Sequence, residues 1–274
     1  AYGFWHHFST VSTNTTPIKF CAIGKNGSTE WRKVFKALTK PEYCNNDDVN
    51  DKCDGKFNTA QKLSDDVPQT VFIRDPLERL LSAYLDKCVK PNVRVSQGHC
   101  EPNEVFGTDF LERKYNKLQK KEQQQKRLDL TNVLQDMDKE MFAAYVDLLP
   151  LKWNVHFVPQ AIFCDLYRNI DNYDVYKMGT DFMSELDRMA NKYGGMLPQI
   201  LDDTFQYQSK PTNESSITNL GTDKAHGTKA PSKVSKYYSS RAVRRALEYL
   251  SIDYVTLGLE VPMWAREMLY DNVV

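Results

Sequence analysis

CAIGKNGSTEWRKVF, residues 21–35, joins a short apolar run to a segment with helical spacing. The run at residues 18–24 predicts a buried strand that ends in glycine. After Ser28 the apolar positions recur at i, i+3, i+4 and i+7, which is the buried stripe of a helix packed on a sheet. These positions are Trp31, Val34, Phe35 and Leu38. Residues 18–39 are therefore expected to form a strand, a loop and a helix in succession.

The loop between this strand and helix has the composition of an anion-binding site. The first backbone N–H groups of a helix lack partners, and the helix dipole favours negative charge there. Gly27 lets a ligand approach the backbone, while Ser28 and Thr29 offer hydroxyl donors. Lys25 adds a positive charge just ahead of them. In the Walker loop of nucleotide triphosphatases the lysine follows the last glycine directly, so the order Lys-Asn-Gly-Ser-Thr excludes that loop. The alternative is a tight turn with a capping serine.

A second strand and helix are expected over residues 70–88. TVFIR, residues 70–74, is rich in β-branched and aromatic side chains, which favour a strand. Asp75 can cap the next helix, and Pro76 occupies the favoured first helical position. The buried stripe of this helix is expected to consist of Leu77, Leu80, Leu81 and Tyr84.

Arg74 and Ser82 form a second candidate anion site in this segment. Arg74 ends the strand, and ligands of open α/β sheets bind at the carboxyl ends of strands. Its guanidinium can grip a phosphate with two hydrogen bonds, and the hydroxyl of Ser82, eight residues later, can donate to the same group. Two such sites side by side predict a nucleotide with phosphates at two separated positions. The alternative for Arg74 is a surface ion pair with Asp75 or Glu78.

The remaining periodic segments complete an alternation of strands and helices. Residues 109–149 are expected to be a helical insertion whose central charged run is a solvated face, and residues 173–178 a strand. Helices are expected at 182–193 and around 243–250. The chain is therefore expected to be one α/β domain over residues 1–274, with a mainly parallel central sheet flanked by helices.

The charge balance and the apolar runs exclude several classes of partner. Thirty-six basic residues equal thirty-six acidic ones, so a long nucleic-acid footprint is not expected. No run reaches the roughly 20 apolar residues of a membrane span, and the N-terminus lacks the pattern of a signal peptide. Because the sequence starts with Ala1, we interpret it as the soluble part of a membrane-anchored protein that does not itself contact the membrane.

The cysteines and sequons favour an oxidising compartment. Disulfides can close the loops between Cys44 and Cys53 and between Cys88 and Cys100. No CxxC motif occurs, and a metal site is therefore not expected. Glycosylation sequons begin at Asn14, Asn26 and Asn213. A glycan at Asn26 would obstruct the anion-binding loop, so this sequon is expected to stay unmodified.

The two motifs together resemble those of sulfotransferases that use 3′-phosphoadenosine 5′-phosphosulfate, and most closely the Golgi carbohydrate sulfotransferases. Residues 24–34, GKNGSTEWRKV, follow that branch's pattern Pro-Lys-x-Ala-Cys-Thr-Asn-Trp-Lys-Arg-Val, with departures at Gly24, Gly27-Ser28 and Glu30. The second pattern, Arg-x-Pro-x-x-Arg-x-x-Ser-x-Tyr, is matched in full by Arg74, Pro76, Arg79, Ser82 and Tyr84. Residues 153–164 and 226–259 are similar to two further blocks of the family, with Phe157, Leu250 and Leu257 in place of the usual aromatic residues.

The resemblance implies a role for each motif. The loop Lys25, Asn26, Gly27, Ser28 and Thr29 is expected to bind the 5′-phosphosulfate, with Lys25 neutralising the charge that develops on the bridging oxygen. Arg74 and Ser82 are expected to hold the 3′-phosphate, and for Arg79 we favour a salt bridge within its helix. The donor would leave as 3′-phosphoadenosine 5′-phosphate, and the Golgi lumen is the expected compartment.

A hydroxyl acceptor also requires a general base. We favour His156, which lies in a family-like segment, over His226, over Glu30 and over the carboxylates of residues 42–66. His6 and His7 are expected in an unanchored terminus, and His99 in a disulfide loop.

The acceptor itself stays open at this point. A carbohydrate is favoured, and a small alcohol or a peptide tyrosine is the alternative. Outside this activity, the alternatives are a P-loop-like kinase, disfavoured by the loop order, and an inactive glycan-binding relative, disfavoured by the intact Lys25, Arg74 and Ser82.

Overall fold

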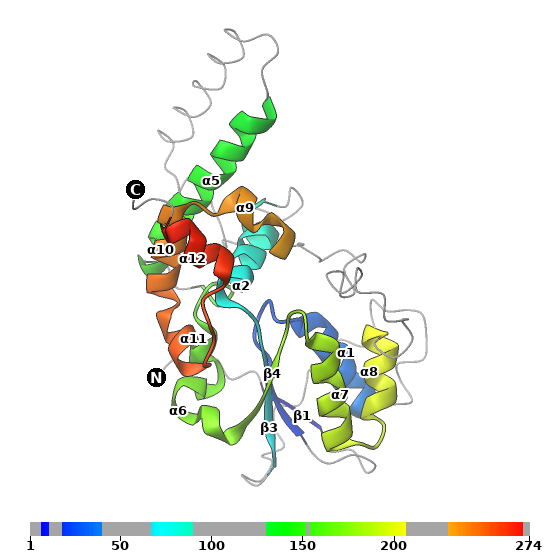
Figure 1. Cartoon of the computed structure of the whole chain (residues 1–274). Helices are drawn as coiled ribbons and strands as arrows, with labels where there is room; N and C mark the ends of the chain where they lie inside the picture. Colours follow the sequence, from blue (N-terminus) through cyan, green and yellow to red (C-terminus); the bar gives the residue numbers. More distant parts are fainter. Residues whose placement is uncertain are drawn as a thin grey trace. The chain divides into compact units, whose positions relative to one another are not determined.

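A computed structural model describes residues 7–10, 18–39, 67–89, 130–151, 154–206 and 230–270 (Figure 1). The chain divides into two compact units, each built from two separate stretches of sequence. The first unit comprises Ala1–Asp75 and Pro159–Ala225, and the second comprises Pro76–Val158 and His226–Val274. The single domain expected over residues 1–274 stays a prediction.

The first unit contains a four-stranded sheet in the order β1-β2-β3-β4. Strands β2 (Ile18–Cys21), β3 (Gln69–Ile73) and β4 (Tyr173–Lys177) run parallel, with Cys21 opposite Val71 and Ile73 opposite Lys177. This arrangement confirms the predicted α/β class with its mainly parallel sheet. The carboxyl ends of β2 and β3 therefore lie side by side at one edge, which is where the two candidate anion sites begin.

The N-terminal strand was not predicted. Strand β1 (His7–Thr10) pairs antiparallel with β2 and places His7 opposite Cys21. The expectation that His7 lies in an unanchored terminus is therefore wrong. The four residues HFST have little apolar character, so backbone hydrogen bonds to β2, rather than a local sequence pattern, define this strand.

Three helices of the first unit cover the sheet and bury an aromatic core. They are α1 (Ser28–Thr39), α7 (Phe182–Tyr193) and α8 (Leu197–Phe205), and α8 contacts both of the others (Figure 1). The ring of Trp31 lies 4.3 Å from that of Phe72 and 5.0 Å from that of Phe20, centroid to centroid. All four predicted apolar positions of α1 are buried, which confirms the predicted helix and anchors its N-terminus.

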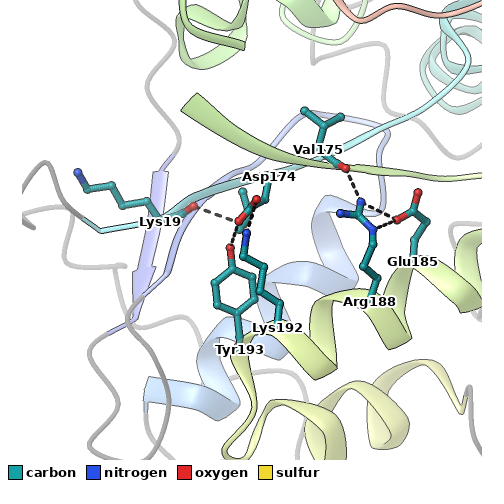
Figure 2. Close-up of polar contacts among 8 residues, drawn as sticks. Lys19, Asp174, Val175, Glu185, Arg188, Lys192 and Tyr193 are labelled. Carbon is teal, nitrogen blue, oxygen red and sulfur yellow. Dashed lines mark hydrogen bonds and ion pairs between the residues drawn. The ribbon is translucent and has the colours of Figure 1, made fainter. Parts of the chain in front are cut away.

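Polar contacts fix α7 against β4, as Figure 2 shows. The ammonium group of Lys192 lies 2.5 Å from a carboxylate oxygen of Asp174, and the Tyr193 hydroxyl donates to the other oxygen. Burial, followed by this carboxylate, raises the pKa of Tyr193 well above its ordinary value. One helical turn away, Arg188 donates to the backbone carbonyl of Val175 at 2.5 Å. The helix is thus attached to two neighbouring residues of the strand, Asp174 and Val175.

Helices dominate the second unit. The long ones are α2 (Pro76–Tyr84), α5 (Leu130–Leu148), α10 (Ser240–Tyr249) and α12 (Met263–Tyr270), and α10 contacts α2, α5 and α12. Shorter elements are η1 (Leu85–Val89), η3 (Leu149–Leu151), η7 (Pro231–Lys233), α9 (Val234–Tyr237) and α11 (Ser251–Thr256). The four predicted apolar positions of α2 are all buried. Helix α5 lies within the helical insertion expected at 109–149, whose residues 109–129 lie outside the described residues, so the insertion stays a prediction.

Candidate active site

The turn between β2 and α1 has an unusual backbone conformation. Lys25 and Gly27 have φ angles of 72° and 69°, and the first helical hydrogen bond runs from the Trp31 N–H to the Gly27 carbonyl at 3.0 Å. Glycine adopts this conformation freely, but lysine does so rarely and at a cost of about 1–3 kcal/mol. A Cβ at position 27 would lie 3.4 Å from the terminal methyl of Met178, which is an ordinary contact, so the positive φ rather than lack of space favours glycine there. The turn depends on its surroundings to hold Lys25 in the same conformation.

Asn26 supplies part of that support. Its side chain is buried, and its Nδ2 donates to the Phe72 carbonyl at 2.9 Å and to Oε1 of Gln160 at 2.6 Å. The amide thus points into the protein, between the turn and the end of β3. Its burial also leaves no room for a glycan, which agrees with the expectation that this sequon stays unmodified.

Gln160 connects the same network to the second motif. Its Oε1 accepts from the Arg74 N–H at 3.0 Å, and its Nε2 donates to the Arg74 carbonyl at 2.8 Å. Together these bonds resemble one rung of a β-ladder, placed directly after the last residue of β3. The backbone of Arg74 is thereby held beside the turn that carries Lys25.

The segment that carries Gln160 is itself anchored. It forms η4 (Gln160–Asp165), followed by α6 (Leu166–Asn169) and η5 (Ile170–Asn172), which leads into β4. Cys164 is disulfide-bonded to Cys21 at the end of β2, with 6.1 Å between the two Cα atoms. The Tyr173 hydroxyl donates to the Cys164 carbonyl at 3.1 Å, and burial, followed by Asp165, raises the pKa of Tyr173 to about 12. The first unit therefore gathers the ends of β2 and β3 around η4.

The other two predicted site residues belong to the second unit. Ser82 is buried on α2. His156 is half-buried in a turn, where its backbone N–H donates to Oδ1 of Asn154 at 3.0 Å. The first unit thus brings together Lys25, Asn26, Gly27, Ser28, Thr29 and Arg74, while Ser82 and His156 lie in the second unit.

Arg79 differs from a typical surface arginine. Its side chain is buried, and its Nη1 donates to the carbonyl of Val158 at 2.8 Å. Its positive charge also opposes the rise in pKa that burial causes at Tyr249 on α10. Arg79 therefore helps to fix the turn that carries His156 inside the second unit.

Comparison with known protein families identifies the chain. The model of the Sulfotransferase family matches residues 8–259, and this match spans both units. The chain belongs to the sulfotransferase family. No curated protein and no solved structure gives a match. The family assignment makes the chain a transferase that moves a sulfuryl group to a hydroxyl acceptor.

The structure describes only some of the alternative bases of this sulfotransferase. Glu30 is ion-paired with Lys33 at 2.8 Å on the outside of α1. His226, His6, His99 and residues 42–66 lie outside the described residues. Among the residues that are described, no group of three or more His, Cys, Asp or Glu side chains is arranged to hold a metal ion. No helix in the same part of the chain has the length and apolar character to cross a membrane.

Sequence reasoning missed the residues that support the sulfotransferase loops. Gln160 and Cys164 lie in the family-like segment at 153–164, and the cysteine there was the available signal for the disulfide. The loops expected to close at Cys44–Cys53 and Cys88–Cys100 stay predictions, because Cys44, Cys53 and Cys100 are outside the described residues. Cys88 is disulfide-bonded, to a partner outside them.

Proposed function

We propose that this sulfotransferase moves a sulfuryl group from 3′-phosphoadenosine 5′-phosphosulfate to a hydroxyl group of a carbohydrate. The observation that carries the proposal is the junction of two anion-binding segments at adjacent strand ends. The Lys25–Thr29 turn follows β2, Arg74 follows β3, and Gln160 joins them. A donor with phosphate groups on two sides of its ribose matches two cationic segments in this arrangement.

The roles of the individual residues follow from their chemistry. The N-terminus of α1 and the hydroxyls of Ser28 and Thr29 bind the 5′ end of the donor, and Arg74 and Ser82 bind its 3′-phosphate. In the transfer, the acceptor oxygen bonds to sulfur while the bond from sulfur to the bridging phosphate oxygen breaks. Lys25 neutralises the charge that develops on that oxygen, and 3′-phosphoadenosine 5′-phosphate leaves. His156 takes the acceptor proton as general base.

The cysteines support a secretory location for this reaction. Disulfides such as Cys21–Cys164 persist in oxidising compartments, and Cys88 is bonded as well. We therefore place the protein in the Golgi lumen, where glycan hydroxyls are available as acceptors. A small alcohol or a peptide tyrosine is the alternative acceptor.

The first test measures which nucleotide the protein prefers. 3′-Phosphoadenosine 5′-phosphate at 100 times its Kd should stabilise the fold by about 2.7 kcal/mol. In a chain of this length that corresponds to a Tm increase of about 5 °C. ADP at the same concentration should give a much smaller increase. Arg74→Ala should remove the difference between the two nucleotides, whereas the matched control Arg168→Ala, an exposed arginine of the same unit, should keep it.

The second test measures transfer of radiolabelled sulfate from the donor to a panel of glycans, small alcohols and tyrosine peptides. Labelling of glycans alone supports the proposal, and labelling of another acceptor class replaces it. In the first test, equal stabilisation by both nucleotides would contradict a site for two phosphates. Binding of the 3′-phosphorylated nucleotide without transfer to any acceptor would instead identify an inactive glycan-binding relative.

A further inference from the structure

The carboxamide of Gln160 makes hydrogen bonds to both the Lys25–Thr29 turn and Arg74. The side chain is fully buried, and both lone-pair positions of Oε1 are occupied, one by Asn26 Nδ2 and one by the Arg74 N–H. Its Nε2 donates to the Arg74 carbonyl. The opposite orientation of the amide would place its NH₂ group against two other N–H donors, so these neighbours determine its orientation.

Gln160 joins the Lys25–Thr29 turn to Arg74, the residue that follows β3. Asn26 bonds Phe72 two residues earlier, and Gln160 extends this network to Arg74. The backbone that carries Gln160 is also held in place, because η4 is cross-linked to β2 through Cys164 and hydrogen-bonded to β4 through Tyr173. A movement of Gln160 would therefore change the turn and Arg74 together.

We propose that Gln160 is a positioning residue that couples the Lys25–Thr29 turn to Arg74. The groups at the 5′ and 3′ ends of the donor are then bound at a fixed separation. This inference rests on the proposed function. Gln160 itself touches neither the donor nor the acceptor. Its effect is to fix the distance between two groups that do, which makes the affinity for a 3′-phosphorylated nucleotide exceed that for the same nucleotide without this phosphate.

The test is the ratio of two Kd values, that of adenosine 5′-phosphate divided by that of 3′-phosphoadenosine 5′-phosphate, measured by calorimetry. Gln160→Met keeps the size of the side chain and removes all three hydrogen bonds, and it should lower this ratio about tenfold. Gln160→Asn is a milder, uncharged variant that sets the carboxamide back by one methylene, and it should lower the ratio less. Gln199→Met, the same change at an exposed glutamine of α8, is the matched control and should leave the ratio unchanged.

A merely structural role would weaken both nucleotides by the same factor, so an unchanged ratio in both Gln160 variants overturns the inference. A wild-type protein that does not distinguish the two nucleotides overturns the proposed function as well. Hydrogen exchange provides a readout without nucleotide. In Gln160→Met the backbone amides of residues 23–29 should exchange faster, while those of α8 should be unchanged. Unaltered exchange at residues 23–29 also overturns the coupling.

Discussion

Asn26→Asp replaces an NH₂ donor by an oxygen with almost no change in shape. In the wild type this donor faces two acceptors, the Phe72 carbonyl at 2.9 Å and Gln160 Oε1 at 2.6 Å. The variant places a third oxygen between them in a buried position. The substitution therefore tests whether the turn is held by the hydrogen bonds described above or only by packing.

The expected loss of stability follows from these two bonds. Each contributes about 1 kcal/mol, and the Phe72 carbonyl left without this donor costs roughly 1–3 kcal/mol more. The free energy of unfolding should thus fall by about 3–5 kcal/mol. Burial beside two carbonyl oxygens also raises the pKa of the new carboxyl above its ordinary value of about 3.9. The folded state then holds a proton that the unfolded state has released, so stability is lost as the pH rises through the folded pKa.

Urea unfolding at pH 4, 5, 6 and 7 measures both parts, with Asn26→Ala as the control that loses the same bonds without adding a charge. At pH 4 the protonated carboxyl can still donate one hydrogen bond, so Asn26→Asp should be at least as stable as Asn26→Ala. Above pH 4, Asn26→Asp should lose about 1.4 kcal/mol per pH unit relative to Asn26→Ala until the raised pKa is reached. A constant difference from pH 4 to 7 would mean that the carboxylate at this position is solvated, and it would refute the buried network.

Three further predictions concern the general base, a buried phenol and the disulfide. His156→Ala should lower turnover by about 100-fold or more while nucleotide affinity stays within error; full activity assigns the base to another residue. Tyr173→Phe should cost about 1 kcal/mol at pH 7 by removing the bond to Cys164. Because burial raises the pKa of Tyr173 to about 12, this phenol should account for roughly 2 kcal/mol of the stability that the wild type loses between pH 10 and 12, and the variant should have a shallower decline in alkaline urea titrations. An equally steep decline would contradict the buried phenol. Replacing Cys21 and Cys164 together by alanine should lower the free energy of unfolding by roughly 2–5 kcal/mol, and an unchanged urea midpoint would show that the cross-link does not stabilise the unit.

Local patterns were sufficient to predict the parallel strands and the helices that flank the candidate site. Val71, Phe72 and Ile73 form a continuous apolar run, as expected for a strand buried on both faces, and all three are buried. The helical spacing of Leu77, Leu80 and Leu81 likewise matches their burial. These predictions succeeded because the signal lies within a few residues of the element that it describes.

The support of the site was not predictable in this way, because it depends on contacts between distant residues. Gln160 is 134 residues from Asn26 and 86 from Arg74, so the apolar run around it at residues 157–163 indicates burial but not its partners. Asn26 was assigned to the ligand as a member of a loop, whereas its side chain points into the protein. Strand β1 depends on its partner β2, since its own residues alternate only weakly.

The disulfide beside the site has a consequence for how the chain is made. Cys21 is the first cysteine of the sequence and Cys164 the last, 143 residues apart. A growing chain therefore presents every other cysteine to Cys21 before its native partner exists, namely Cys44, Cys53, Cys88 and Cys100. Pairing of Cys44 with Cys53 and of Cys88 with Cys100 leaves Cys21 free for Cys164, whereas any earlier bond at Cys21 must be attacked and released by a thiolate before the native pair forms. A chain cut short before residue 164 never forms the cross-link beside the Lys25–Thr29 turn.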